Sequence, residues 1–226
     1  MENIIKEFLK IPTTCISDAM DGLSNLHTAI KPLKDEYKLA GRAFTVKIPV
    51  GENLAVLKAI SEAKPGDILV VDAKGDQYRA IAGDFVVGMA QTLGIGGLVV
   101  DGVIRDIAGV KALNFPVFSR GTTVAASGKA GVGEVNVPIS CGGASVTPGD
   151  IIVGDADGVV VIPQAREQEI LAISLVKMKK DEAREKSISG NPEAIRKHLS
   201  QLLSHNPEKF TNPKEEPPHP ANDSMK

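Results

Sequence analysis

The sequence contains no tryptophan and few other aromatic residues, with six Phe and two Tyr among 226 residues. Proteins that bind single-stranded nucleic acid usually stack the bases on aromatic side chains, so the composition argues against this class of function. The formal net charge is only −2 at pH 7. A chain with this charge balance lacks the broad basic surface that phosphate backbones require. We therefore expect no nucleic-acid partner.

Cysteines and long apolar runs are also scarce. The two cysteines, Cys15 and Cys141, lack the spacing of a metal site, and two buried or semi-buried thiols in a reducing compartment are expected. No stretch approaches the ~18 apolar residues that a membrane-spanning helix needs. The first ten residues carry four charges and lack the apolar core of a signal peptide. We expect a cytoplasmic protein without a membrane partner.

The overall composition is that of an ordinary globular protein, with 42% hydrophobic and 24% charged residues. The length fits one domain with a peripheral extension, and we place the domain at residues 1–190 and the extension at 191–226. Residues 164–204 are charged and predict helices. From His205 onward the chain is polar and rich in proline, which is typical of an extended tail.

The middle of the chain, residues 66–163, is rich in Gly, Val and Ile and predicts a strand-rich core. Two of its segments resemble each other, Pro65–Asp72 and Pro148–Asp155. Each begins with a Pro-Gly turn, continues as a strand and ends at an aspartate. One copy in each half indicates a core of two related pieces.

Three further local patterns give expectations about secondary structure. Phe44–Val50 predicts a strand, and the segment from Thr13 predicts a helix that a Thr or Ser side chain caps. The run Asp155–Gly158 contains the acidic spacing of a calcium loop. Because the remaining calcium ligands are absent, a hairpin turn is the preferred interpretation.

The residues that carry chemistry lie between Gly83 and Asp106. Asp84–Leu93 predicts a short helix, and Gly97–Asp101 predicts a buried strand that follows it. A helix of about ten residues advances about 15 Å, and a strand of about five residues returns roughly the same distance. The loop that carries Arg105 and Asp106 is therefore expected beside the start of the helix.

This meeting point combines an anion site with oxygen ligands. The backbone N–H groups of Phe85 and Val86 in the first helical turn can bind an anion. Arg105 can grip a carboxylate with its planar guanidinium. Asp106 can hold a hard cation, and Asp84 can hold the water molecules of that cation. The alternative is that both aspartates are helix N-caps and Arg105 is a surface ion pair.

Such a site is suited to a pyruvate-like acid. It can bind the carboxylate and the 2-keto oxygen of one molecule together. The cation would stabilise the enolate charge that develops when the adjacent carbon–carbon bond breaks.

The ordered motifs of the chain resemble a known family. Asp84 is followed by GGLVVDGVIRD, which ends in Arg105-Asp106. This arrangement is similar to that of the 4-hydroxy-4-methyl-2-oxoglutarate aldolases, a family that also contains the regulator of ribonuclease E activity A. The resemblance covers about residues 13–190. Supporting matches are Ser17–Asp21, Gly51–Ala55, Lys64–Asp67, Phe115–Phe118, Gly133–Pro138 and Asp155–Val161.

The resemblance implies an α/β fold of the β/β/α swivelling type, like that of phosphohistidine domains, in a single domain with C-terminal helices. It implies homotrimers or homohexamers with active sites between subunits. The implied activity is that of a class II lyase that uses Mg²⁺ or Mn²⁺ on a small 2-keto acid substrate. Aldol cleavage yielding pyruvate and decarboxylation of oxaloacetate are the two implied reactions.

The resemblance also implies roles for single residues. Asp106 would be the direct metal ligand, and Asp84 would hold metal-bound water and take part in catalysis. Arg105 would act in catalysis and bind the substrate, whose carboxylate the Phe85 and Val86 amides would receive. A further acid from a neighbouring subunit's C-terminal helix would be Glu182, and Glu185 fits almost as well.

Gly109 departs from the aldolase pattern, which has Glu or Asp three residues after the metal-binding aspartate. Its absence resembles the ribonuclease regulator branch, so a non-catalytic regulator that binds a ribonuclease or another protein is the alternative function. A Schiff-base aldolase is not indicated, because Lys47, Lys74 and Lys129 lie beside strand ends or turns where lysine stays solvated. Cys141 has no histidine nearby in sequence, and a buried small residue is expected there.

Overall fold

The structure, a computed structural model, describes residues 2–204. The tail that we predict from His205 onward lies outside the described residues. The chain forms two compact units, of which the first ends at Lys179 and the second begins at Lys180. The predicted domain boundary after residue 190 stays a prediction.

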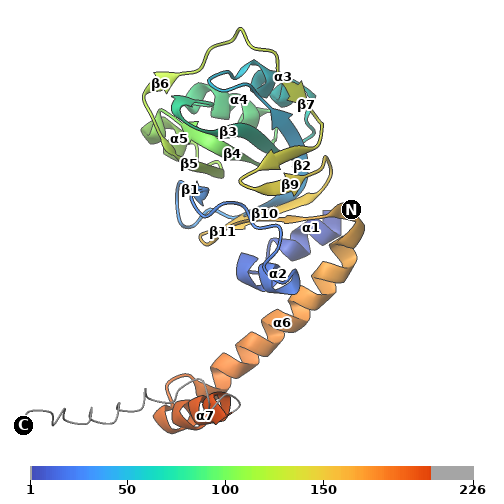
Figure 1. The fold of residues 1–226 in the computed structure, drawn as a ribbon, viewed down its shortest axis with the longest axis vertical. Coiled ribbons are helices and arrows are strands. Elements are labelled where there is room, and N and C mark those ends of the chain that lie inside the picture. Colours follow the sequence, from blue (N-terminus) through green and yellow to red (C-terminus); the bar gives the residue numbers. More distant parts are fainter. Residues whose placement is uncertain (1, 205–226) are drawn as a thin grey trace, which may run out of the picture. The chain divides into compact units, whose positions relative to one another are not determined.

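The first unit is built on a curved sheet with the strand order β1-β5-β4-β3-β2-β10-β11 (Figure 1). Strands β2 to β5 run parallel, whereas β1, β10 and β11 are antiparallel to their neighbours. Lys31 Nζ in β1 donates a hydrogen bond to the Asp157 carbonyl beside β11 at 2.6 Å, so the sheet is nearly closed into a barrel. The strands of this path are β1 (Lys31–Pro32), β2 (Leu39–Lys47), β3 (Ile68–Ala80), β4 (Gly97–Ile104), β5 (Val117–Thr122), β10 (Ile151–Asp155) and β11 (Gly158–Ile162).

Short strands and helices complete the chain. β6 (Ala125–Ala126) pairs with β3, β7 (Glu134–Val135) pairs with β2, and β8 (Ile139–Cys141) with β9 (Ala144–Val146) forms a separate hairpin. The helices are α1 (Glu2–Phe8), α2 (Thr13–Ala19), α3 (Leu54–Glu62), α4 (Asp84–Thr92), α5 (Ile107–Ala112), the 3₁₀ helix η1 (Gln164–Arg166), α6 (Glu167–Ile188) and α7 (Pro192–Ser204). The predicted α/β fold with C-terminal helices is confirmed.

Alternating side chains of the parallel strands divide the interior into two cores. In β3, Leu69 and Val71 pack with α3, α4 and α5, while Ile68 and Val70 pack toward the β8–β9 hairpin and β11. Successive residues of a strand point to opposite faces, and all four side chains are fully buried. A strand buried on both faces reads as the continuous apolar run seen here. A third cluster joins α1, α2 and the start of α6 to the β10–β11 hairpin.

The two similar segments lie on either side of β2. β3 pairs with β2 in parallel and β10 pairs with it antiparallel. The glycine of each Pro-Gly turn is left-handed, with φ of 87° at Gly66 and 91° at Gly149. In each turn the aspartate accepts a hydrogen bond from the backbone N–H three residues earlier, at 2.9 Å for Asp67 and 2.8 Å for Asp150. The predicted internal similarity is confirmed.

Of three local predictions, one was right, one was right with other bounds and one was wrong. The strand predicted at Phe44–Val50 is present as β2, but it runs from Leu39 to Lys47, and β10 pairs with its first half. No side chain caps α2; Thr13 Oγ1 instead donates to Asp155 Oδ1 at 2.7 Å, a contact across the fold that local sequence does not reveal. The run Asp155–Gly158 is the turn of the β10–β11 hairpin, as predicted.

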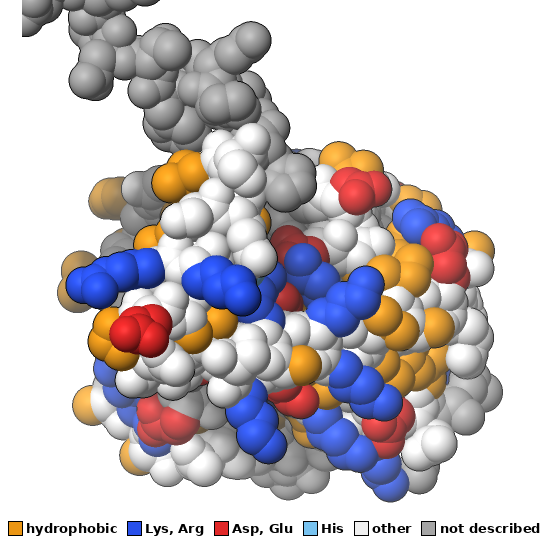
Figure 2. Space-filling view, turned by 90° about the horizontal axis from the view of Figure 1, so that it is seen from below, with side chains coloured by type: hydrophobic (Ala, Val, Ile, Leu, Met, Phe, Trp, Pro, Cys, Tyr) orange, Lys and Arg blue, Asp and Glu red, His pale blue; other side chains and the backbone are white. Residues whose placement is uncertain are grey.

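The charges on the surface, the character of the helices and the cysteines agree with the expectations drawn from the composition. On the face seen in Figure 2, basic and acidic side chains are mixed with hydrophobic ones. No helix within residues 2–204 has the length and the apolar character needed to cross a bilayer. Cys15 and Cys141 are both buried and unbridged, as expected.

Candidate functional site

The predicted helix and strand meet where expected. α4 begins at Asp84, as predicted. β4 is buried along its whole length and continues to Ile104, three residues beyond its predicted end at Asp101, so that it ends directly before Arg105. The Arg105 backbone N–H donates to the Ala82 carbonyl at 3.0 Å and ties the two segments together. A cavity of about 280 Å³ is lined by Asp84, Phe85, Val86, Arg105 and Asp106. The predicted convergence of residues about twenty positions apart in the chain is confirmed.

Two glycines make room for the two carboxylates. A Cβ at Gly83 would overlap Asp106 Oδ2 and would lie 3.3 Å from Arg105 Cγ. A Cβ at Gly109 would overlap Asp84 Oδ2 and would lie 2.8 Å from Asp84 Cβ. Gly83 directly precedes α4 and makes room for Asp106 at the start of α5. Gly109 lies in α5 and makes room for Asp84 at the start of α4. An acidic side chain at Gly109 would displace Asp84, which gives the departure from the aldolase pattern a structural consequence.

Asp106 has an unusual backbone conformation. It occupies the N-cap position of α5 with φ 56° and ψ 42°, and its side chain makes no cap hydrogen bond. Its Oδ2 instead lies 3.2 Å from Arg105 Nε, and both side chains are about two-fifths exposed, at 42% for Arg105 and 44% for Asp106. Left-handed residues other than glycine are uncommon and cluster at functional sites. Asp106 therefore occupies the N-cap position without capping the helix through its side chain, and the ion pair with Arg105 is present.

Asp84 is the first residue of α4 and not its cap, a position that Gly83 occupies without a side-chain hydrogen bond. Asp84 Oδ1 accepts a hydrogen bond from the Phe85 N–H at 2.7 Å. One of the two amides predicted to receive a substrate carboxylate therefore already has an acceptor. A substrate carboxylate would compete with Asp84 for it.

The carboxylate oxygens of Asp84 and Asp106 in the cavity suit a hard divalent cation that keeps most of its water molecules. Within residues 2–204, no three His, Cys, Asp or Glu side chains are grouped so that they could hold a metal ion. Mg²⁺ characteristically retains several waters and binds through one or two carboxylates. Asp84 and Asp106 supply that number of carboxylates in one cavity. The residues present therefore fit Mg²⁺ or Mn²⁺, which Asp84 and Asp106 would hold.

Three polar residues from distant segments line the same cavity, namely Asn53, Ser127 and Lys129. Sequence reasoning did not assign them to the site. Asn53 belongs to the family-like motif Gly51–Ala55, and this motif was the only indication that Asn53 lies at the site. Lys129 was considered only as a Schiff-base lysine, for which it is unsuited. No sequence pattern near Lys129 connects its loop with Asp84.

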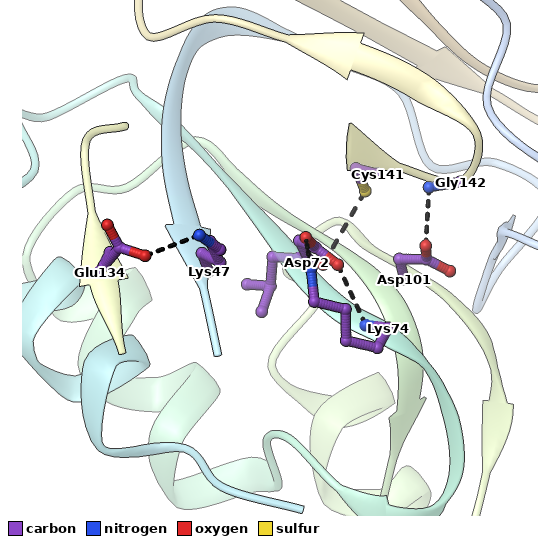
Figure 3. Close-up of polar contacts among 8 residues, drawn as sticks. Lys47, Asp72, Lys74, Asp101, Glu134, Cys141 and Gly142 are labelled. Atoms are coloured by element: carbon purple, nitrogen blue, oxygen red, sulfur yellow. Dashed lines mark hydrogen bonds and ion pairs between the residues drawn. The ribbon is translucent and has the colours of Figure 1, made fainter. Parts of the chain in front are cut away.

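The remaining reactive side chains are engaged elsewhere (Figure 3). Lys47 Nζ lies 2.7 Å from Glu134 Oε1, and this hydrogen bond raises the pKa of Lys47. Lys74 Nζ lies 2.5 Å from Asp72 Oδ2. Burial raises the pKa of the Cys141 thiol far above its usual range, which disfavours the nucleophilic thiolate. The prediction that Cys141 is buried is confirmed.

The acids proposed to act in a neighbouring subunit belong to the second unit. Glu182 and Glu185 are exposed on α6. Their contribution to another subunit's site stays a prediction.

Comparison with known proteins adds family information to this geometry. A family model described as RraA-like, Aldolase/RraA, matches residues 13–161. A relative from Halalkalibacterium halodurans, provisionally named 4-hydroxy-4-methyl-2-oxoglutarate aldolase, is 60% identical over 89% of this chain and 96% of its own length.

Two solved structures share the fold. One is an uncharacterised protein from Pseudomonas syringae, with a TM-score of 0.79, 27% identity and coverage of 88% of this chain and 94% of that one. The other is the RNA-processing inhibitor RraA from Thermus thermophilus, with a TM-score of 0.63, 30% identity and coverage of 68% and 93%.

Proposed function

Since the chain belongs to the RraA-like aldolase family, we propose that it is a divalent-metal-dependent lyase. Its reaction would break a carbon–carbon bond of a small pyruvate-containing acid, by aldol cleavage of the 4-hydroxy-4-methyl-2-oxoglutarate type, by oxaloacetate decarboxylation, or by both. The observation that carries the proposal is the single cavity shared by Asp84, Arg105 and Asp106. Its volume of about 280 Å³ is at the low end of ligand pockets, which suits a small acid.

Asp84, Arg105 and Asp106 each have a defined task in this proposal. Asp106 would hold Mg²⁺ or Mn²⁺ directly, and Asp84 would hold it through water. When bound, the cation would supply a positive charge for the oxygen of the 2-keto group. Arg105 would bind and orient the keto acid with its guanidinium. Asp84, fixed on the Phe85 N–H, would orient the water that protonates the carbon left by bond cleavage.

We further propose that the working form is a homotrimer or a pair of trimers. An apolar groove of about 700 Å³ is lined mainly by Leu57, Ile60, Phe85, Met89, Leu93 and Leu113. Phe85 is 77% exposed and lines both this groove and the polar cavity. Large exposed apolar surfaces commonly mark interfaces. A second copy seated on the groove would bring its side chains beside the cavity, which agrees with the predicted role of Glu182.

The test is turnover of oxaloacetate and of 4-hydroxy-4-methyl-2-oxoglutarate with Mg²⁺ or Mn²⁺, before and after chelation. Asp106→Asn and Arg105→Lys should each lower kcat/KM at least 100-fold while the oligomer persists. Asp21→Asn is the matched control, because Asp21 is also left-handed, with φ 56°, and does not line the cavity. Unchanged turnover in the two site variants, or indifference to the chelator, would reject the proposal.

A second candidate function is non-catalytic regulation of a ribonuclease or another protein. Two observations favour it, namely Gly109 in place of an acidic residue and the likeness to the inhibitor from Thermus thermophilus. Absence of metal-stimulated turnover together with direct binding to a ribonuclease would establish it instead.

A further inference from the structure

Helix α7, which closes the described part of the chain, exposes an apolar stripe. Its large apolar residues recur at the spacing i, i+4, i+7 and i+8, so they share one side of the helix. They are Ile195, Leu199, Leu202 and Leu203, which are 39%, 49%, 57% and 49% exposed. No residue of α7 is buried. The helix therefore presents an apolar ridge that residues 2–204 leave uncovered.

The sequence defines α7 as a helix in its own right. Gly190 follows the preceding helix with a left-handed backbone, at φ 71°. Asn191 Oδ1 accepts hydrogen bonds from the N–H groups of Glu193 and Ala194, each at 3.1 Å. Pro192 is the first helical residue. An asparagine cap followed by proline is a typical helix start, so the stripe belongs to an element with a fixed beginning.

The apolar groove of the first unit has the complementary form. Side chains of α3, α4 and Leu113 line it, and its volume is about 700 Å³. Phe85 and Leu93 in its wall are 77% and 51% exposed. An amphipathic helix binds such a groove by placing its i, i+4 and i+7 side chains into it. The stripe of α7 has this spacing.

Three occupants of the groove and the stripe can be compared. Interfacial membrane helices are rich in Lys and Arg and carry Trp or Phe on the apolar side, whereas α7 has one Arg, one Lys and no aromatic residue. Pairing of α7 with α7 would join helices of 13 residues, and helices of this length are marginal without support. The groove offers that support, because buried residues of α3 and α4 anchor its walls to the core.

The stripe and the groove each occur once on every chain. If α7 of one copy fills the groove of the next, each chain has one stripe and one groove covered. A contact between two different surfaces is heterologous, and heterologous contacts form a ring where the rotation closes. The exchange therefore agrees with a trimer and needs no further apolar partner.

We propose that α7 of one copy occupies the groove between α3 and α4 of a second copy. The inference rests on the proposed function in one respect, namely that the working form is an oligomer. Ile195, Leu199 and Leu202 enter the groove, and the charged side of α7 stays in water. Because Phe85 lines both the groove and the polar cavity, the docked helix lies beside the cavity of the neighbouring copy.

The first test joins the helix and the groove covalently. Two full-length chains with different tags are co-expressed, one with Leu199→Cys and the other with Leu93→Cys, and are treated with a short bismaleimide. A product that carries both tags is expected on a denaturing gel. The control replaces Leu93→Cys by Leu23→Cys, because Leu23 is also exposed, at 67%, and does not line the groove. The native Cys15 and Cys141 are buried, so they contribute little background.

The second test measures the dissociation constant of the oligomer by analytical ultracentrifugation. Leu199→Glu places a charge in the apolar contact and should raise this constant about 100-fold or more. Lys197→Glu adds the same side chain on the opposite side of α7 and should change the constant less than about threefold. Urea unfolding of both variants verifies that the first unit remains folded.

Each result supports or overturns the exchange. Absence of the two-tag product overturns it, and so does an equal yield with Leu23→Cys. A product that joins only Leu199→Cys chains shows that α7 pairs with α7 and also overturns it. An unchanged dissociation constant in Leu199→Glu has the same meaning.

The two proposals fail in different ways. Neither test of the exchange needs turnover, so the two-tag product without metal-stimulated turnover rejects only the proposed lyase activity. Metal-stimulated turnover without the two-tag product rejects only the exchange of α7.

Discussion

Two groups of aspartates have opposite surroundings: Asp72 and Asp101 lie within β3 and β4, whereas Asp84 and Asp106 follow these strands. The first group is buried: Asp72 is 2% exposed and Asp101 is 6% exposed. Asp101 accepts hydrogen bonds from Arg120 Nε and, at 2.7 Å, from the Gly142 N–H, which attaches the β8–β9 hairpin to the sheet (Figure 3). Each carboxylate of this buried cluster has partners on both oxygens.

The second group, Asp84 and Asp106 in the cavity, is less fully paired. Asp106 is 44% exposed at its side chain and has Arg105 as its ion-pair partner. Asp84 accepts from the adjacent N–H of Phe85. The neighbouring Asn53 leaves an acceptor without any partner in the described chain.

All four residues are aspartates, so their hydrogen-bond partners, and not the residue type, distinguish structural from functional carboxylates. A carboxylate whose hydrogen-bonding capacity is used inside the fold holds that fold together. A carboxylate that keeps open capacity beside a cavity can exchange partners with a ligand. Substitutions in the buried cluster should therefore change stability, and those in the cavity should change turnover.

The largest expected effect is that of Asp101→Ala. Removing this carboxylate leaves the Arg120 guanidinium, 15% exposed, without its counter-charge, and breaking a buried pair in this way typically costs about 3–5 kcal/mol. Urea unfolding should show a loss of that size. The control is Asp181→Ala, which breaks a more exposed pair with Arg184 and should cost less than ~1 kcal/mol. A small loss for Asp101→Ala would remove the distinction between the two groups.

A smaller effect is expected at Gly109, where an added side chain would crowd the cavity. In Gly109→Ala the new Cβ would overlap the Asp84 carboxylate, so that Asp84 must shift. Overpacking of this kind costs about 1–3 kcal/mol, and misplacing a catalytic group by about 1 Å can lower turnover on the order of 100-fold. Denaturant unfolding and kcat/KM measure the two effects.

The other helical glycine tests whether crowding is the cause. At Gly88 an added Cβ would meet only Leu113 Cδ1, at an ordinary 3.9 Å. Gly88→Ala should therefore stabilise the chain by about 0.4–1 kcal/mol through the unfolded state. Equal behaviour of the two alanine variants would show that crowding against Asp84 has no consequence.

The buried cluster should also give an alkaline pH dependence. The pKa of Cys141 in the folded chain lies above its ordinary value of 9.0, with burial as the largest cause and the Asp101 charge next. Above pH 9 the unfolded chain releases the thiol proton while the folded chain keeps it, so stability is present at lower pH and is lost as pH rises. The slope is about −1.4 kcal/mol per pH unit. In unfolding curves from pH 8 to 10.5, Cys141→Ala should lack this component, and an unchanged slope would contradict it.

Local geometry explains why part of the site could be predicted. The helix from Asp84 and the strand from Gly97 have fixed rises per residue, so a return of the chain toward Asp84 could be predicted. The length of the strand could not, because β4 extends to Ile104, three residues beyond its predicted end. The two Pro-Gly turns were equally local, since each depends on a left-handed glycine and an aspartate that closes the turn. Short-range rules were sufficient for the two turns and for the return of the chain, but not for the length of β4.

The other wall of the cavity could not be predicted in this way. Asn53 and Lys129 come together because the Gly128 loop pairs with the Gly51–Glu52 segment, far away in sequence. The early start of β2 likewise depends on its pairing with β10. Such pairings are set by the whole sheet, and no pattern within one segment specifies them.

The smallest expected effect on stability is that of Asp106→Asn, and it tests the comparison most directly. The ion pair with Arg105 is about two-fifths exposed on each side, and pairs of this kind contribute about 0–1 kcal/mol. Asparagine also tolerates the left-handed backbone of this position. The free energy of unfolding should therefore change by less than ~0.5 kcal/mol, while the same sample loses its metal-stimulated turnover. A loss of stability near that of Asp101→Ala would place Asp106 among the structural carboxylates, because a side chain that holds the fold together is not free to exchange its partner for a ligand.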